Sequence, residues 1–262
     1  MKEIEAKEVN EVMAGIDITA DVGAGMETAD KESYAIPFLK VLQKISPQCD
    51  EADAAYVQGA KGGMLYNTVT GKLYESVTFL PCAFQRRFLQ WAPRGSEGGF
   101  KGELMPEDVA AMRASGEVVE QDGRLYVGEA NEKKSDRLVD TRSHFGLLVD
   151  ENGASQVLLP LSSTQIKKSK QLMSMLSAVK VKAANGMVTP PTWMNRIKIT
   201  TVLESNDQGS WYGVKFESDG LIDSQDLYNA GKEFHEVVSA GEAKVSYDQG
   251  NAADKGEGAE KF

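Results

Sequence analysis

Apolar and polar side chains alternate along several stretches of this chain, a pattern that predicts a protein built mainly from β-strands. Ordered structure is expected to begin near Tyr34, where apolar residues gather around Pro37. A first hairpin is predicted just downstream, with Asn67 to Gly71 as its turn. The longest strand pattern then covers 73–91, and Pro81 within it predicts a bulge or an edge position because proline lacks a backbone donor.

The end of that long run combines aromatic and basic residues. Alternation places Phe84, Arg86 and Phe88 on one face of the strand, and Gln85, Arg87, Leu89 and Trp91 on the other. A glycine-rich loop follows. The charged stretch at about 101–137 is interpreted as an insertion, with a short helix over 106–114 and a strand over 125–127.

The second half of the chain repeats the β pattern and adds two helices. Strands are predicted over 138–149 and 157–161, with a turn at 150–153. Ser162 and Gln165 have the spacing of a capping box, which predicts a helix from there to about Ala184. The remaining elements are strands over 196–203 and 210–216 and a helix over 224–239.

Several strands, then a helix, then a closing hairpin is the element order of an OB-fold. We therefore expect a mainly β protein with some α (α+β), an OB-fold-like antiparallel barrel with a helix between strands, an inserted charged region and disordered acidic tails. The domains expected from the sequence are a disordered acidic tail (1–33), an OB-like core (34–216, with the insertion at about 101–137), a C-terminal helix (217–239) and a second disordered acidic tail (240–262).

Charge is unevenly distributed along the chain. The net charge is −10, but residues 1–33 hold nine acidic and three basic residues, and residues 217–262 hold eleven acidic and four basic ones. The middle is left with a small positive charge. No acidic residue lies between Glu151 and Glu204, and none lies between Ser76 and Ser96. A basic middle between acidic ends is typical of a protein that binds a polyanion.

The basic segments also carry aromatic residues, and single-stranded nucleic acid is bound by cations along the backbone together with aromatic faces for the bases. The candidate residues for single-stranded DNA are Phe84, Arg86, Arg87, Phe88, Trp91, Arg94, Lys167, Lys168, Lys170, Lys182, Trp193 and Arg196. For each aromatic residue, a place in the core is the alternative. The C-terminal Phe262, at the end of an acidic tail, is a candidate for insertion into a partner's pocket.

Catalytic and metal-binding motifs are scarce. The two histidines lie beside no nucleophile motif, and Cys49 and Cys82 form no CxxC pair, so we expect no enzyme activity, no cofactor, no zinc site and no disulfide framework. Asp140, Arg142 and His144 share a strand face and leave a small polar site open. No stretch is apolar enough to span a membrane, and the acidic N-terminus is unlike a signal peptide, so the protein is expected in the cytoplasm.

The sequence resembles phage-encoded single-stranded DNA-binding proteins of the OB-fold type. The resemblance rests on four strings: Pro37 to Lys40, Tyr66 to Gly71, Phe84 to Arg94, and Ser162 to Lys170. It implies coating and protection of single-stranded DNA in the host cytoplasm during phage replication and recombination. It also implies contact with a phage DNA polymerase or helicase through the C-terminal tail. Lys255 and Lys261 make this tail less acidic than those of the family.

Two other functions stay open at this stage. One is a protein-interaction, virion or host-takeover factor whose basic face meets an acidic protein. The other is a metal-dependent nucleic-acid enzyme that uses Asp140 with His144, or the carboxylates Glu129, Glu132, Asp136 and Asp140. The sequence also leaves open whether the chain forms a homo-oligomer.

Overall fold

The computed structural model describes residues 21, 24–28, 34–93, 96, 99–151, 153–184, 186–207, 209–243, 245 and 247. The chain divides into two compact units, 1–34 and 35–262. The described part of the first unit contains a turn in which the Gly25 amide donates to Glu27 Oε1 at 2.9 Å. Most of the tail expected over 1–33 lies outside the described residues. The fold and the candidate site belong to the second unit.

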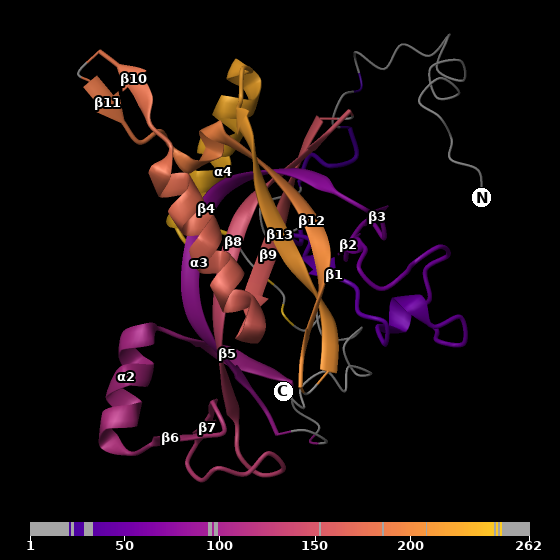
Figure 1. The fold of residues 1–262 in the computed structure, drawn as a ribbon, viewed down its shortest axis with the longest axis vertical. Helices are drawn as coiled ribbons and strands as arrows, with labels where there is room; N and C mark the ends of the chain where they lie inside the picture. The colour runs from indigo at the N-terminus through magenta and orange to yellow at the C-terminus, as the bar shows by residue number, and fades with distance from the viewer. Residues whose placement is uncertain are drawn as a thin grey trace. The chain divides into compact units, whose positions relative to one another are not determined.

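The second unit consists mainly of antiparallel strands (Figure 1). The strands are β1 (Leu39–Val41), β2 (Leu65–Asn67), β3 (Leu73–Tyr74), β4 (Val77–Trp91), β5 (Phe100–Leu104), β6 (Val118–Gln121), β7 (Arg124–Val127), β8 (Arg137–Asp150), β9 (Gly153–Ser162), β10 (Val181–Ala183), β11 (Gly186–Val188), β12 (Asn195–Asn206) and β13 (Gly209–Leu221). The helices are α2 (Pro106–Ser115), α3 (Ile166–Ala178) and α4 (Gln225–Ser239), with short 3-10 turns η3 (Pro47–Cys49), η4 (Ser163–Gln165) and η5 (Thr192–Met194). The predicted α+β class with antiparallel sheets is confirmed.

The main sheet has the strand order β13-β12-β4-β8-β7-β6, and β9 and β5 add to it beside β8 and β4. Strand β4 is its centre, because β4 pairs with β8 over nearly its whole length. The ladder shifts register between Pro81 and Ala83, which confirms the bulge predicted from the proline. Gly146 lies directly opposite Pro81, and a Cβ there would come 2.4 Å from the Leu80 carbonyl oxygen. Only glycine fits at this crossing.

The OB-fold-like antiparallel barrel expected from the sequence is corrected to an open arrangement, because the sheet does not close into a barrel. Within the described residues, β9 and β13 form no ladder with each other. The segment around β1 lies between them: Phe38 bridges Leu158 of β9, and the Gln43 side chain hydrogen-bonds the backbone of Tyr212 in β13 through both its nitrogen and its oxygen. The segment around β1 contacts β9 through its backbone and β13 through the Gln43 side chain. Since β9 and β13 do not pair with each other, the sheet stays open.

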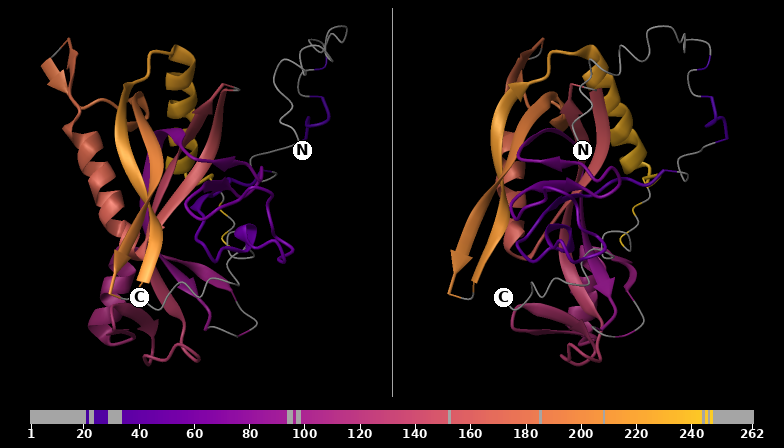
Figure 2. Two further views of the ribbon diagram at one scale, coloured as in Figure 1. Left: turned by 45° about the vertical axis from the view of Figure 1, so that its right-hand side comes forward. Right: turned by 90° about the vertical axis from the view of Figure 1, so that its right-hand side faces the viewer.

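Helices α3 and α4 lie on opposite faces of the sheet, as both views of Figure 2 show. The alternation of β4 explains this arrangement, since Phe79 belongs to the core under α3 and Leu80 to the core under α4. Leu172 and Leu176 supply the buried side of α3, and Phe234 and Val238 supply that of α4. Ser224 caps α4 by accepting a hydrogen bond from the Leu227 amide.

The charged insertion has a small core of its own. Its predicted helix and strand are confirmed as α2 and β7. Val109 of α2, Val118 of β6 and Leu125 of β7 pack against Phe88 and Leu138 of the two central strands. The insertion is therefore attached to one end of the β4–β8 ladder through buried apolar contacts.

Two boundaries differ from the sequence prediction. Helix α3 ends at Ala178, and the residues predicted to continue it to Ala184 include strand β10, which pairs with β11 in a hairpin. The dipeptide Asn185-Gly186 between two valine-containing strands favours such a hairpin over a helix.

The predicted capping box does not form, because Gln165 instead accepts a hydrogen bond from the Val214 amide. Packing also continues past residue 240, since Tyr247 is buried against Phe38 and Phe100.

Candidate nucleic-acid interface

The aromatic residues of β4 divide between core and surface. The alternation predicted from the sequence is present, with Leu89 and Trp91 on the α4 side and Phe84 and Phe88 on the opposite face. Phe88 is only 7% exposed under α2, so it offers no free face to a base. Trp91 packs against Phe100, with ring centroids 5.4 Å apart. Phe88 therefore corrects the sequence prediction, because the insertion supplies the apolar partners that cover it. Trp91 is half-buried and has a partner in the fold, Phe100.

Phe84 is the most exposed aromatic residue of β4. It is 37% exposed, and its ring centroid lies 5.1 Å from that of His144 on β8. The two residues are direct cross-strand partners. His144 holds the inner side of the Phe84 ring, and part of the ring remains available to a ligand.

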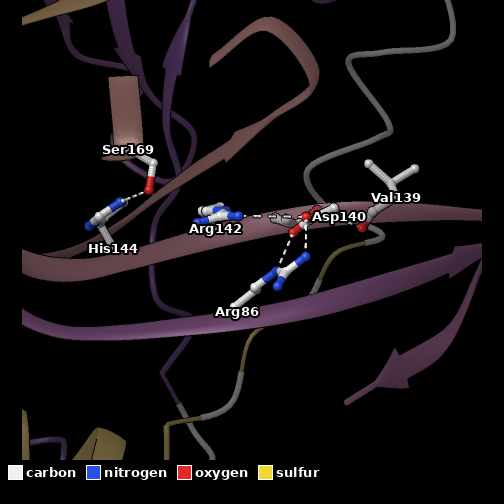
Figure 3. Close-up of polar contacts among 7 residues, drawn as sticks. Arg86, Val139, Asp140, Arg142, His144 and Ser169 are labelled. Carbon is white, nitrogen blue, oxygen red and sulfur yellow. Dashed lines mark hydrogen bonds and ion pairs between the residues drawn. The ribbon is translucent and has the colours of Figure 1, made fainter. Parts of the chain in front are cut away.

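Both arginines of β4 contact acidic residues from other strands. Arg86 forms a bidentate ion pair with Asp140 of β8, with Nε–Oδ1 and Nη2–Oδ2 distances of 3.0 and 2.7 Å (Figure 3). Arg87 lies on the other face, with Nε 3.7 Å from Glu103 of β5. The absence of acidic residues from 76 to 96 therefore does not mean that the arginines in this segment lack acidic partners, because those partners come from other strands.

The β8 residues beside Phe84 and Arg86 form a polar row along the strand face (Figure 3). Arg142 Nη2 lies 3.7 Å from Asp140 Oδ2, and His144 Nε2 lies 2.8 Å from the Ser169 hydroxyl of α3. Burial and then the nearby Arg142 lower the pKa of His144 to about 4. His144 is neutral at neutral pH, so it adds no charge to the row.

Helix α3 presents lysines to solvent. Lys167 and Lys170 are exposed and make no ion pair with any described residue. Lys168 lies on a different side of the helix, where its Nζ is 2.7 Å from Glu204 Oε1 of β12. Beyond the helix, Lys182 is exposed on β10, in the hairpin that projects from the end of α3 (Figure 1). Three of the four predicted lysines, Lys167, Lys170 and Lys182, are therefore exposed to solvent on α3 and the neighbouring strand β10.

Trp193 and Arg196 do not join this lysine surface. Trp193 packs against α4, with its ring centroids 5.0 Å from His235 and 6.1 Å from Tyr228. Gly231 of α4 allows this contact, because a Cβ there would lie 2.7 Å from Trp193 Cβ. Arg196 forms an ion pair with Asp219 across the β12–β13 hairpin at 3.0 Å. Both residues have structural partners.

Two predicted site residues, Arg94 and Phe262, lie outside the described residues. The carboxylates proposed for metal-dependent chemistry are dispersed: Asp136 is held by Lys101 and Gln90, and Glu132 by Arg124. In the part of the chain that the structure describes, no three His, Cys, Asp or Glu side chains gather as they would around a metal ion. The described helices include none with the length and apolar character of a membrane span.

A family model described as Pam3 phage gp34-like protein matches residues 6–244. The chain belongs to this family. The matched residues include every strand and helix of the second unit from β1 to α4, and the family's description supports a phage origin. No curated protein and no solved structure matches the chain.

Sequence reasoning missed the cross-strand partnership of Arg86, Arg142 and Asp140. Asp140 and Arg142 were recognised as sharing a face of one strand, but only the β4–β8 register places Arg142 directly opposite Arg86. The available signal was the charged alternation of 140 and 142 in the first half of a strand pattern whose later part, 145–149, has no polar side chain. This alternation indicated a polar face on the strand. The strand that pairs with it, β4, could be identified only from the structure.

Proposed function

We propose that this protein binds single-stranded DNA without sequence preference, in phage DNA replication or recombination within the host cytoplasm. The observation that carries the proposal is the solvent-facing cation surface of α3 and β10, made by Lys167, Lys170 and Lys182. No acidic residue occurs in the sequence from 152 to 203, which contains both elements. Such a surface attracts a phosphate backbone and releases its counterions on binding.

The strand order supports an OB-type origin for the core. Strands β4, β8 and β9 form an antiparallel meander, α3 follows, and the hairpin β12–β13 returns so that β12 pairs with β4. This is the element order and the first-to-fourth strand pairing of an OB-fold. The gap between β9 and β13, filled here by the segment around β1, is where the chain departs from a closed OB barrel.

The residues assigned to DNA are fewer than the sequence predicted. Lysines 167, 170 and 182 would contact phosphates, and Phe84 would stack a base. Phe88, Trp91, Trp193, Lys168 and Arg196 have structural partners and are assigned to the fold. The protein does not need a metal or a cofactor for this function.

The proposal is tested by fluorescence anisotropy of labelled oligo-dT, with unlabelled duplex of equal length and polyglutamate as competitors. We expect single strands to bind more tightly than duplex, polyglutamate to compete poorly, and affinity to fall steeply between about 50 and 200 mM salt. Equal competition by polyglutamate would favour a protein-interaction factor with an acidic partner. Absence of binding at low salt would refute the proposal.

A further inference from the structure

The polar row on the β4–β8 face has more positive than negative charge. Arg86 and Arg142 share a single carboxylate, Asp140, and the neighbouring His144 is neutral at neutral pH. Arg86 satisfies that carboxylate with two short hydrogen bonds. Arg142 is left with one long contact of 3.7 Å, so the row carries one positive charge that Asp140 does not compensate.

Arg142 also has an unmet hydrogen-bonding group. Its Nε is buried and has no hydrogen-bond partner among the described residues. A buried donor without a partner is costly, which leaves the Arg142 side chain poorly satisfied inside the fold. The side chain is 15% exposed, so a phosphate would bond the part of the guanidinium that remains accessible, not the buried Nε. The arginine fork fits phosphate oxygens better than a lysine does, because its planar donors can bond two oxygens together.

An aromatic surface lies next to this cation pair. Phe84 is two residues from Arg86 on the same face of β4, about 7 Å along the strand. Its ring is partly exposed, and His144, which is anchored to Ser169, holds it from behind. The spacing suits a single nucleotide with its phosphate at the arginines, which Figure 3 shows side by side, and its base on Phe84.

We propose that Arg142 and Arg86 bind one phosphate of the DNA strand, that Phe84 stacks the adjacent base, and that Asp140 competes with the phosphate for the arginines. This inference rests on the proposed function and extends the interface from α3 onto the sheet. Asp140 thereby weakens binding at this point of the strand. It also keeps the two arginines from repelling each other when DNA is absent.

Three substitutions test this site, each with a different signature in oligo-dT titrations over a range of salt. Arg142→Gln should weaken binding and reduce the slope of log K against log salt by about 0.7, the value for one phosphate on a single strand. Phe84→Ala should weaken binding by about fivefold or more and leave that slope unchanged. Asp140→Asn should strengthen binding.

Arg113→Gln is the matched control, because Arg113 is an exposed arginine of α2 that is paired with Glu120. Its affinity should equal that of the wild type. Thermal melting checks that every variant is folded, and if Arg142→Gln does not fold, Arg142→Lys keeps the charge and should weaken binding through loss of the fork alone. The site is overturned if wild-type protein binds oligo-dT but folded Arg142 and Phe84 variants bind equally well. Weaker binding by a folded Asp140→Asn variant would also overturn it. No binding by the wild type refutes the proposed function itself.

Discussion

Lys168 Nζ lies 2.7 Å from Glu204 Oε1 and joins helix α3 to strand β12. Burial alone would raise the pKa of Glu204, but hydrogen bonds from Lys168 and Trp211 outweigh burial, and the pKa is lowered. The carboxylate is ionised at neutral pH and neutralises the lysine. Two other lysines of α3, Lys167 and Lys170, remain exposed. The basic stretch of α3 thus divides into a structural lysine and lysines available to a ligand.

Replacing Lys168 and Lys170 separately should reveal this division. Lys168→Met should leave the affinity for oligo-dT nearly unchanged and cost at most about 1 kcal/mol of stability, because the ion pair is partly exposed. Lys170→Met should lower the affinity and reduce the salt slope by about 0.7. Anisotropy titrations at several salt concentrations measure both. Equal losses from the two variants would contradict the division.

Phe88 should matter for stability and not for base stacking. Phe88→Ala removes a ring that is 7% exposed beneath α2, and such a cavity costs about 3–5 kcal/mol. Phe84→Ala, the matched control at a 37% exposed ring, should cost much less. Urea denaturation followed by circular dichroism measures both free energies of unfolding. A mild effect at Phe88 would mean that α2 does not hold that ring.

His144 should make stability depend on pH. Its folded-state pKa is about 4, against 6.5 for an ordinary histidine, so the unfolded chain binds a proton that the folded protein excludes between those values. The stabilisation is complete above pH 6.5 and is lost as pH falls toward 4, in total about 3 kcal/mol.

The measurement is urea denaturation of wild type and His144→Asn at pH 7.5 and pH 4.5. Other groups titrate in the same interval, so the comparison is between the two proteins' losses on acidification. The variant should lose less stability than the wild type by about 2–3 kcal/mol. Equal losses would show that His144 titrates normally in the folded protein.

Gly146 is expected to tolerate no side chain. In Gly146→Ala, the new Cβ would lie 2.4 Å from the Leu80 carbonyl oxygen and equally close to the Phe79 ring. The bulge of β4 would have to shift, which should cost about 3 kcal/mol. Ser155→Ala, at an exposed position of β9, serves as the control. Differential scanning calorimetry measures both, and a melting temperature unchanged by Gly146→Ala would refute the close packing at this crossing.

Local sequence patterns were sufficient to predict most elements of this fold. The hairpins β8–β9 and β12–β13, helix α2 and helix α4 follow from alternation, helical periodicity and turn residues. The bulge at Pro81 follows from the missing backbone donor of proline. The end of α3 was misplaced, because the helical pattern outweighed the hairpin signal of Asn185-Gly186. Each of these signals acts over a few residues.

The open sheet and the candidate site depend on contacts between distant segments. Nothing in the local pattern around Gln43 indicates that its side chain will bond Tyr212 and stand between two sheet edges. The acid-free windows likewise gave no indication that Arg86 and Lys168 would meet Asp140 and Glu204 from outside those windows. Composition along the chain predicted a cationic region, and only the register of the strands shows which cations remain unpaired.

The most direct test is the salt dependence of oligo-dT binding by the wild type and by a triple variant, Lys167→Gln, Lys170→Gln and Lys182→Gln. These three exposed lysines are the ones assigned to phosphates. The triple variant should remain folded, bind much more weakly, and show a salt slope smaller by about 2 than that of the wild type. An unchanged affinity and slope in a folded triple variant would contradict the assignment of this surface to single-stranded DNA.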